Sequence, residues 1–269
     1  MKFGYCSSMG AKDSAGIGYD RIPALKRLGY DYVEFPVAGI MALSDPSFEE
    51  GPLKAVEENS FPCLRMNVFS PASIRVTGPD ADLDKALAYA SGALLRARRL
   101  GAQVIVFGSS GSRNVPCAMP AAEGLRQFAS FLQSLAPMAE SFGITIAIEP
   151  LNKQETNLVN HFPEACALAR QINHPNIGVL ADTFHMGLGN EPVTLLAEAG
   201  ALLRHVHVAR VLGRALPCPG DGEDYGLLFA TLRRIGYDGC ISMEAHVQND
   251  FEHEAGQALR HLREAMESA

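Results

Sequence analysis

Short apolar segments alternate with amphipathic helical patterns along the whole chain. The predicted strands cover residues 2–6, 31–35, 63–68, 103–108, 144–149, 177–182, 203–208 and 240–245. The predicted helices cover residues 18–28, 47–58, 80–100, 120–142, 161–172, 191–200, 225–235 and 250–267. The central strands are continuous apolar runs, which is typical of a parallel sheet covered on both faces. Eight such strand–helix units predict a single (β/α)₈ TIM barrel.

The helix boundaries carry local evidence of their own. Asp80 and Asp82 open the longest Ala- and Leu-rich pattern, Arg98 and Arg99 close it, and Gly101 follows as a helix stop. The alternative fold is an open doubly wound sheet. That alternative is disfavoured because no GxGxxG turn follows the first strand.

Length and composition agree with one barrel. The chain has 269 residues without a low-complexity linker, so we expect one domain over residues 1–269. A formal net charge of −7 disfavours a nucleic-acid surface. No apolar stretch is long enough to cross a membrane, and the N-terminus has no signal-peptide pattern. The six cysteines never form a CxxC pair, which predicts free thiols and a cytoplasmic protein.

Four consecutive apolar runs each end on a side chain that can bind a metal. These side chains are Glu149, Asp182, His207 and Glu244. In a barrel the carboxyl ends of the strands meet at one face, where active sites are built. Three carboxylates and one imidazole form an oxygen-rich site that suits Mn²⁺, Mg²⁺ or Co²⁺ better than a structural zinc ion. The alternative, an ordinary set of salt-bridge partners, is weaker for four successive strands than for any one of them.

Several motifs around these residues resemble a known family. The segments are EPLNKQETN (149–157), ADTFHM (181–186), HVHVA (205–209), PGDG (219–222) and GYDGCISMEAH (236–246). They resemble the xylose isomerase-like TIM barrel family of sugar phosphate isomerases and epimerases, in particular the ketose 3-epimerases of the D-tagatose 3-epimerase type. The resemblance implies one divalent metal, with Mn²⁺ expected and Mg²⁺, Co²⁺ or Zn²⁺ as alternatives. It assigns Glu149, Asp182, His207 and Glu244 as the ligands.

The resemblance also implies an activity in carbohydrate metabolism. The expected enzyme is an isomerase or epimerase that moves a proton on a small sugar or sugar phosphate through a metal-stabilised enediolate. Glu149 and Glu244 would act as the catalytic acid and base from opposite sides of the substrate. The resemblance also implies a homodimer or a homotetramer, because relatives of this kind often pair in this way. No nucleic acid and no membrane is expected as a partner.

Four further residues are candidate substrate contacts. His185 and Glu155 match family residues that bind substrate, and Asn67 ends a strand where it could line the pocket. The family carries a Glu and then an Arg after the HxH strand. Here the Glu is missing and Arg210 stands near its place, so Arg214 is the expected substrate arginine.

Two loops, one histidine and Glu34 have less certain roles. Glu34 ends a predicted strand, where it could line the pocket. The stretch 107–116 is either a flexible loop or a phosphate cradle with Arg113 as the counter-charge. Residues 70–80 resemble a lid over the site. His205, two residues before His207, is expected to lie at another depth or to point outward.

Other functions remain as alternatives. A keto-polyol dehydratase on the same barrel would begin with the same proton removal and would differ in its product. A hydroxypyruvate-type aldose–ketose isomerase and a non-catalytic sugar-binding barrel are two further candidates. An endonuclease IV-type repair nuclease is disfavoured, because it takes zinc ligands from early strands and all eight histidines here lie at or after His161.

Overall fold

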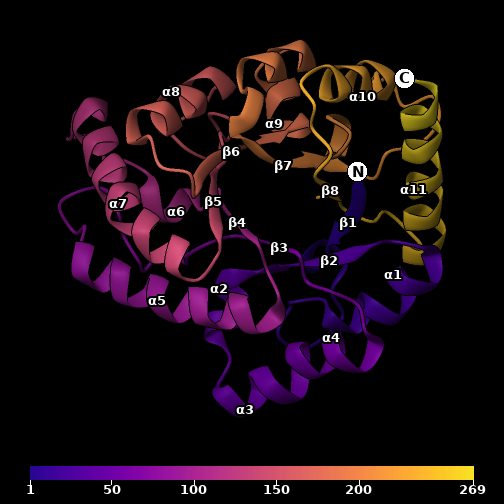
Figure 1. Cartoon of the computed structure of the whole chain (residues 1–269), viewed down its shortest axis with the longest axis horizontal. Coiled ribbons are helices and arrows are strands. Elements are labelled where there is room, and N and C mark those ends of the chain that lie inside the picture. Colours follow the sequence, from indigo (N-terminus) through magenta and orange to yellow (C-terminus); the bar gives the residue numbers. More distant parts are fainter.

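The computed structural model describes all 269 residues and shows a closed barrel of eight parallel strands (Figure 1). Each strand pairs with the next one along the chain, and β8 closes the barrel on β1. The strands are β1 Lys2–Cys6, β2 Tyr32–Pro36, β3 Arg65–Asn67, β4 Val104–Phe107, β5 Thr145–Ile148, β6 Ile177–Asp182, β7 Leu203–Val208 and β8 Cys240–Met243. The predicted fold class is therefore confirmed.

Helices surround the barrel as an outer layer. They are α1 Ile22–Leu28, α2 Val37–Ala42, α3 Asp45–Phe48, α4 Lys54–Asn59, α5 Leu83–Leu100, α6 Ser110–Arg113, α7 Ala121–Ser141, α8 Phe162–Ile172, α9 Thr183–Leu188, α10 Tyr225–Arg234 and α11 Phe251–Ser268. Helices α1 and α11, from the two ends of the chain, lie side by side where the barrel closes. None of the helices is long and apolar enough to cross a bilayer.

Two predicted helices differ from the structure. The prediction of a helix over 191–200 was wrong, because this segment forms a short 3₁₀ turn at Val193–Glu198 after Pro192. The crossover from β6 to β7 instead begins with α9, which starts directly at the end of β6. The predicted helix 47–58 is broken by a π-helical turn at Glu49–Leu53 that contains Pro52. Proline has no backbone N–H for the helical ladder, so the regular pattern cannot run through it.

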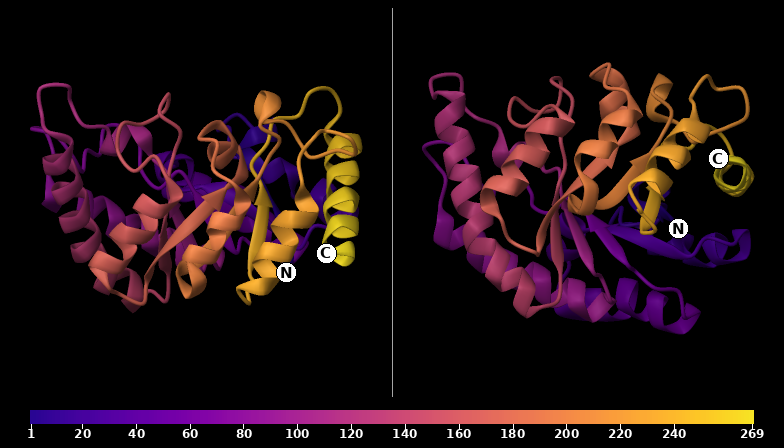
Figure 2. Two further views of the ribbon diagram at one scale, coloured as in Figure 1. Left: turned by 90° about the horizontal axis from the view of Figure 1, so that it is seen from above. Right: turned by 45° about the horizontal axis from the view of Figure 1, so that its top comes forward.

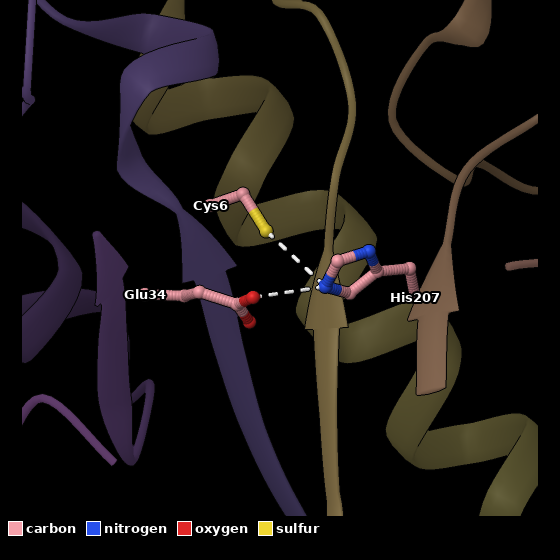
Figure 3. Close-up of side chains that lie close together, drawn as sticks. All are labelled: Cys6, Glu34 and His207. Carbon is pink, nitrogen blue, oxygen red and sulfur yellow. Dashed lines mark hydrogen bonds and ion pairs between the residues drawn. The ribbon is translucent and has the colours of Figure 1, made fainter. Parts of the chain in front are cut away.

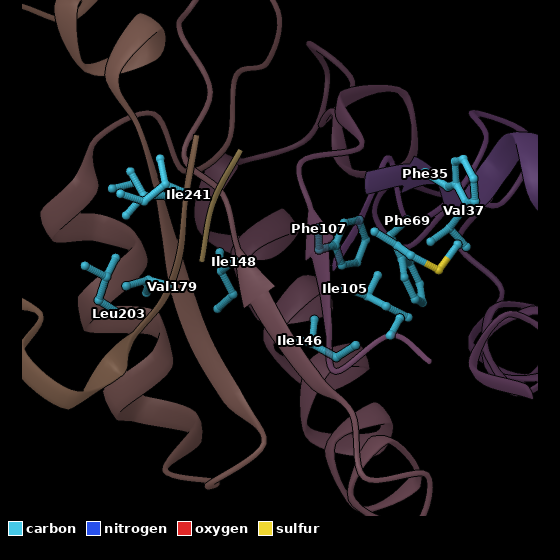
Figure 4. Close-up of a cluster of buried hydrophobic side chains, with 14 of the residues drawn as sticks. Phe35, Val37, Phe69, Ile105, Phe107, Ile146, Ile148, Val179, Leu203 and Ile241 are labelled. Atoms are coloured by element: carbon cyan, nitrogen blue, oxygen red, sulfur yellow. The ribbon is translucent and has the colours of Figure 1, made fainter. Parts of the chain in front are cut away.

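Each strand buries both of its faces, with a different layer on each side. The outward side chains, such as Phe107, Ile148 and Ile241, form the main hydrophobic core beneath the helices (Figure 4). A small separate cluster of Val104, Val106, Ala147 and Leu180 is made of the alternate residues of three neighbouring strands, which point into the barrel. The strands end at the same face of the molecule, where the connecting loops lie (Figure 2). This face holds the side chains predicted for the site.

Gly4 lies where the barrel interior has no room for a side chain. It pairs in register with Tyr32, and a Cβ at Gly4 would lie 2.2 Å from the Tyr32 ring. The ring cannot swing aside freely, because its hydroxyl is hydrogen-bonded to Ser242 Oγ at 2.7 Å. The small residue in β1 therefore permits a tyrosine to cross the barrel interior.

The substitution Gly4→Ala is expected to destabilise the fold by about 1–3 kcal/mol through overpacking. Gly226 is the matched control, because an added Cβ there meets only Asp224 Oδ1 at 3.4 Å and lies in helix α10. Gly226→Ala should leave stability unchanged or raise it slightly. Urea unfolding measures both variants. Equal stability of Gly4→Ala and the wild type would contradict the packing argument.

Candidate active site

The four predicted metal ligands meet at the carboxyl-terminal mouth of the barrel. Glu149 directly follows β5, Asp182 ends β6, His207 lies near the end of β7, and Glu244 directly follows β8. Asp182 and His207 pair in register across β6 and β7. One donor atom from each of the four residues lies within 4.8 Å of the others, and all four residues are buried. The barrel thus brings together residues that are up to 95 positions apart in the sequence.

Two buried atoms at the centre of this cluster have no hydrogen-bond partner. They are Glu149 Oε1 and His207 Nδ1, which lie 3.6 Å apart. Buried polar atoms are almost always satisfied in folded proteins, so an unpartnered pair facing one point indicates a ligand there. A divalent cation accepts both a carboxylate oxygen and an imidazole nitrogen as ligands. The residues present therefore fit a metal site.

The charges around His207 favour a cation at the same point. Burial alone would lower the pKa of His207, but the neighbouring Glu34, Cys6 and Glu244 raise it well above its usual range. Burial also raises the pKa of Glu149. At Glu244 the opposing effect of burial is outweighed by His207 and Arg214, and the pKa falls to about 2. A proton on Nδ1 or a metal ion bound to Nδ1 would each supply the positive charge that offsets the surrounding carboxylates.

A cavity of about 320 Å³ opens above the cluster. One wall comes from the loop after β3 and includes Ser70 and Ala72, and another comes from the loop after β4 and includes Gly108 and Ser110. Only three of the fourteen lining residues are hydrophobic, so the cavity suits a polar ligand.

Three of the four predicted substrate contacts line this cavity. His185 accepts hydrogen bonds at Nδ1 from the backbone N–H and the side-chain amide of Asn152, at 3.2 and 2.9 Å. Its proton therefore lies on Nε2, which is buried without a partner and 3.5 Å from Asp182 Oδ2. Glu155 accepts from the Asn152 amide at 2.9 Å. Asn152, which sequence reasoning missed, thus positions both residues.

The structure separates the two candidate arginines. Arg214 lines the cavity, and its Nη2 lies 2.5 Å from Glu244 Oε2 and 3.4 Å from Asp182 Oδ2. Arg210 instead lies beside Cys218, with Nη1 3.6 Å from Sγ, in a different surface crevice. Of the two candidate arginines, only Arg214 lies at the cavity, and its contact with a substrate stays a prediction.

Asn67, the fourth predicted contact, does not line the cavity. Its side chain is buried, and Nδ2 donates to Glu244 Oε1 at 2.8 Å. A substrate contact by Asn67 stays a prediction, whereas the hydrogen bond places it as a support for the Glu244 carboxylate.

The phosphate-cradle interpretation of the loop after β4 was wrong for Arg113. The guanidinium is fully buried and donates to the backbone carbonyls of Phe107 and Glu149, at 3.2 and 2.7 Å. Burial lowers the pKa of Arg113 to about 10. This arginine ties the end of β4 to the end of β5 and cannot reach a ligand in the cavity.

The segment predicted as a lid is attached to the neighbouring loop. Arg75 donates to the carbonyls of Gly111, Thr77 and Asn114, and the backbone N–H of Val76 donates to Ser112 O at 3.0 Å. Only its first part, Ser70 to Ala72, lines the cavity. The loops after β3 and β4 therefore form one joined wall.

The remaining predicted positions lie below the site. His205 and His207 share the inward face of β7, and His205 lies deeper, 2.8 Å from Glu34 Oε2. This confirms the prediction that the two histidines differ in depth. The prediction that Glu34 lines the pocket was wrong, because Glu34 is fully buried under His207 and is not among the residues of the cavity wall.

Comparison with known proteins places the chain in a family. The family model described as "Xylose isomerase-like TIM barrel" matches residues 22–265, which is most of the chain. The chain therefore belongs to the xylose isomerase-like TIM barrel family.

Two similar proteins are named as 3-epimerases of ketose sugars. A ketose 3-epimerase of Arthrobacter globiformis is 34% identical over 46% of this chain and 43% of its own length. A D-psicose 3-epimerase of Ruminiclostridium cellulolyticum is 27% identical over 84% of this chain and 78% of its own length. The match therefore spans less than half of the first relative and about four fifths of the second. These names agree with the predicted isomerase class.

A solved structure shows the same fold over the whole chain. The crystal structure of a D-psicose 3-epimerase from Clostridium cellulolyticum, described as containing D-tagatose, has a TM-score of 0.83 at 22% identity. The superposition covers 99% of each chain. This likeness confirms the barrel architecture.

Gly108 gives a test of the cluster geometry. A Cβ at this position would lie 1.9 Å from Glu149 Oε2, although the backbone of Gly108 is not in the left-handed region. Gly108→Ala should therefore push the Glu149 carboxylate away from His207 and weaken Mn²⁺ binding by about 10-fold or more. Competition with a chromogenic chelator measures the affinity.

Gly111→Ala is the matched control for this prediction. Gly111 lines the same cavity, but its added Cβ would meet Ala72 at 2.7 Å and no metal ligand. It should leave Mn²⁺ affinity near that of the wild type. An unchanged affinity in Gly108→Ala would show that the Glu149 oxygen is not held where the structure has it.

Proposed function

We propose that this member of the xylose isomerase-like TIM barrel family is a divalent-metal-dependent sugar epimerase of the ketose 3-epimerase type. The proposal rests on one observation: two of the four candidate metal ligands also line the cavity and two do not. Glu149 and Glu244 line the cavity, whereas Asp182 and His207 do not. Two carboxylates thus face both the cation position and the space for a substrate, and they are the only two acids of the cluster that can reach a substrate carbon.

The two carboxylates both approach Nδ1 of the His207 imidazole, each from a different strand. His207 Nδ1 lies 3.6 Å from Glu149 Oε1 and 3.1 Å from Glu244 Oε2. They project from β5 and β8, which are not neighbours in the barrel. A sugar carbon bound between them would present one face to each. This is the arrangement that inversion of a carbon centre requires.

The reaction that follows is a balanced proton exchange. One carboxylate takes the proton from the carbon beside the ketone, and the other returns a proton to the opposite face of that carbon. The bonds to oxygen are unchanged and nothing is oxidised or reduced overall. A bound divalent cation, held by Glu149, Asp182, His207 and Glu244 and most simply Mn²⁺, would supply positive charge where the enediolate oxygens become negative.

The remaining cavity residues suit the hydroxyl groups of a sugar. Arg214 and the His185 Nε2–H are donors, and the Glu155 carboxylate is an acceptor. Arg214 is the only arginine or lysine that lines the cavity, and it already contacts Glu244 and Asp182. A phosphate group binds most often to clustered basic side chains, and the cavity offers a single one. We therefore expect an unphosphorylated ketose as the substrate.

Solvent exchange across a sugar panel tests this function. The Mn²⁺-loaded protein is incubated in D₂O with unphosphorylated ketoses, aldoses and hydroxypyruvate, and the products are followed by NMR. An epimerase incorporates one deuterium at the inverted carbon beside the ketone and yields the 3-epimer. Loss of water without an epimer would instead indicate the dehydratase, and an aldose product would indicate the aldose–ketose isomerase. No exchange with any sugar of the panel would contradict the proposal.

Removing the charge of either proposed acid or base should stop turnover. Glu149→Gln and Glu244→Gln keep a side-chain oxygen at each position but cannot accept the substrate proton. We expect kcat to fall by about 10²–10⁴ for each variant at saturating Mn²⁺. Circular dichroism and the melting temperature should show that both variants fold.

Glu191→Gln is the control for these two variants. Glu191 is a partly buried carboxylate that accepts from the backbone N–H of Phe162, and it does not line the cavity. Its substitution should leave kcat close to the wild-type value. Turnover by either cavity variant at the rate of this control would remove that glutamate from the acid–base pair.

A further inference from the structure

A second carboxylate contacts the opposite edge of the His207 ring. Glu34 lies in β2, and its side chain is fully buried in the barrel interior. Its Oε1 lies 2.9 Å from His207 Nε2 (Figure 3). Glu149 and Glu244 lie near the other ring nitrogen, Nδ1. Glu34 neither lines the cavity nor belongs to the four side chains that converge beneath it. The proton transfer described above therefore leaves it without a role.

We propose that Glu34 is a positioning residue that holds His207 so that Nδ1, and not Nε2, is the atom presented to the cation. This inference rests on the metal site of the proposed function, but it concerns only how the protein holds the metal. It is independent of which sugar is bound.

The hydrogen bond fixes the tautomer of His207. An ionised carboxylate has no proton to donate, so His207 carries its proton on Nε2 and donates it to Glu34 Oε1. Nδ1, at the opposite edge of the ring, is then the nitrogen whose lone pair a cation would take in place of a proton. Nδ1 is the unpartnered atom that lies near Glu149 and Glu244. A ring that rotated by half a turn would lose the Glu34 bond and direct a C–H group at the cation position.

The Glu34 carboxylate is itself held from three directions. Oε2 accepts from Ser242 Oγ at 2.5 Å and lies 2.8 Å from His205 Nε2. The Tyr32 hydroxyl is 2.7 Å from Ser242 Oγ, so the serine can donate to Glu34 while it accepts from the tyrosine. These contacts join β2, β7 and β8 across the barrel interior. The carboxylate therefore cannot turn without breaking several buried hydrogen bonds, each of which is costly to lose.

The same region does not form a second metal site. Cys6 Sγ lies 3.8 Å from His207 Nε2, so Cys6, Glu34 and His207 are close enough to suggest one. However, the 2.9 Å contact between Glu34 and His207 is a direct hydrogen bond, in which the Nε2 proton occupies the position that an ion would need.

Imidazole ¹⁵N NMR of the wild-type protein tests the proposal without any substitution. The protein is labelled at histidine and loaded with Zn²⁺, which is diamagnetic. We expect one histidine to shift on loading, with a metal-bound Nδ1 and a protonated Nε2 that exchanges slowly with solvent. Coordination through Nε2 would overturn the proposal. Elemental analysis should give one ion per chain, and a second bound ion would also overturn it.

Glu34→Gln tests the same contact by affinity. The carboxylate accepts from several donors, whereas the amide must turn its NH₂ group toward some of them. We expect Zn²⁺ and Co²⁺ affinity to fall by about 10–100-fold, with a changed visible spectrum of bound Co²⁺. Both readouts are measured without sugar, so a failure of the epimerase proposal would leave them intact.

Ser242→Ala is the matched control. It removes one donor to Glu34 Oε2 and keeps the bond from His207 to Oε1. Metal affinity should stay within about threefold of the wild type. If Glu34→Gln weakened binding no more than Ser242→Ala does, the loss would reflect general packing and the proposal would fail. If Glu34→Gln did not fold, the NMR measurement on the wild type would still decide.

Discussion

The His207 ring lies between carboxylates on both of its edges, and the arrangement of the barrel mouth follows from this contact. Glu34 lies 2.9 Å from one ring nitrogen, and Glu244 and Glu149 lie 3.1 and 3.6 Å from the other. Gathering buried carboxylates costs several kcal/mol per charge unless positive charge compensates them. Each acid comes from a different strand, so the closed barrel itself keeps them together. The mouth is therefore built around a place for a cation.

The sequence predicts most of this mouth because its members share a local signal. An apolar run that ends on an acid or a histidine can be found without knowing any contact, and Glu149, Asp182 and Glu244 all carry that signal. Glu34 also ends an apolar run, yet its contact with His207 was not predictable. The two residues are 173 positions apart, and their common depth depends on the stagger of the strands around the barrel. Arg113 illustrates the opposite error. A basic residue after a strand was interpreted as a possible ligand contact, but the structure buries its side chain against backbone carbonyls.

The misjudged crossover between β6 and β7 has a cause at the site itself. Asp182 accepts through Oδ1 from the backbone N–H of Phe184 at 2.8 Å and thereby caps the start of α9. The other oxygen, Oδ2, faces Arg214 and His185. Because α9 starts directly after Asp182, the motif ADTFHM already forms the first turn of the crossover helix. Fewer residues then remain before β7 for the helix that was predicted later in the crossover. The same Asp182 carboxylate therefore caps the helix and serves as the proposed ligand. The hydrogen bond from Phe184 to Oδ1 fixes the carboxylate and thereby orients Oδ2.

Strand ends and loops contribute different properties to the proposed enzyme. The acids that would handle protons follow the strands directly, where the sheet hydrogen bonds restrict their backbone. The groups that would select a sugar stand on loops: Glu155 and Arg214 lie several residues beyond β5 and β7. Arg214 adopts a φ of 45° next to Gly213 at 75°, a left-handed turn that an arginine rarely adopts and that returns its guanidinium toward the mouth. This turn is tied to the segment after β8, because the backbone N–H of His246 donates to Arg214 O at 2.7 Å and Arg214 Nη2 lies 2.5 Å from Glu244 Oε2. The loop that would select a sugar is therefore coupled through Arg214 to one of the carboxylates that would move its proton.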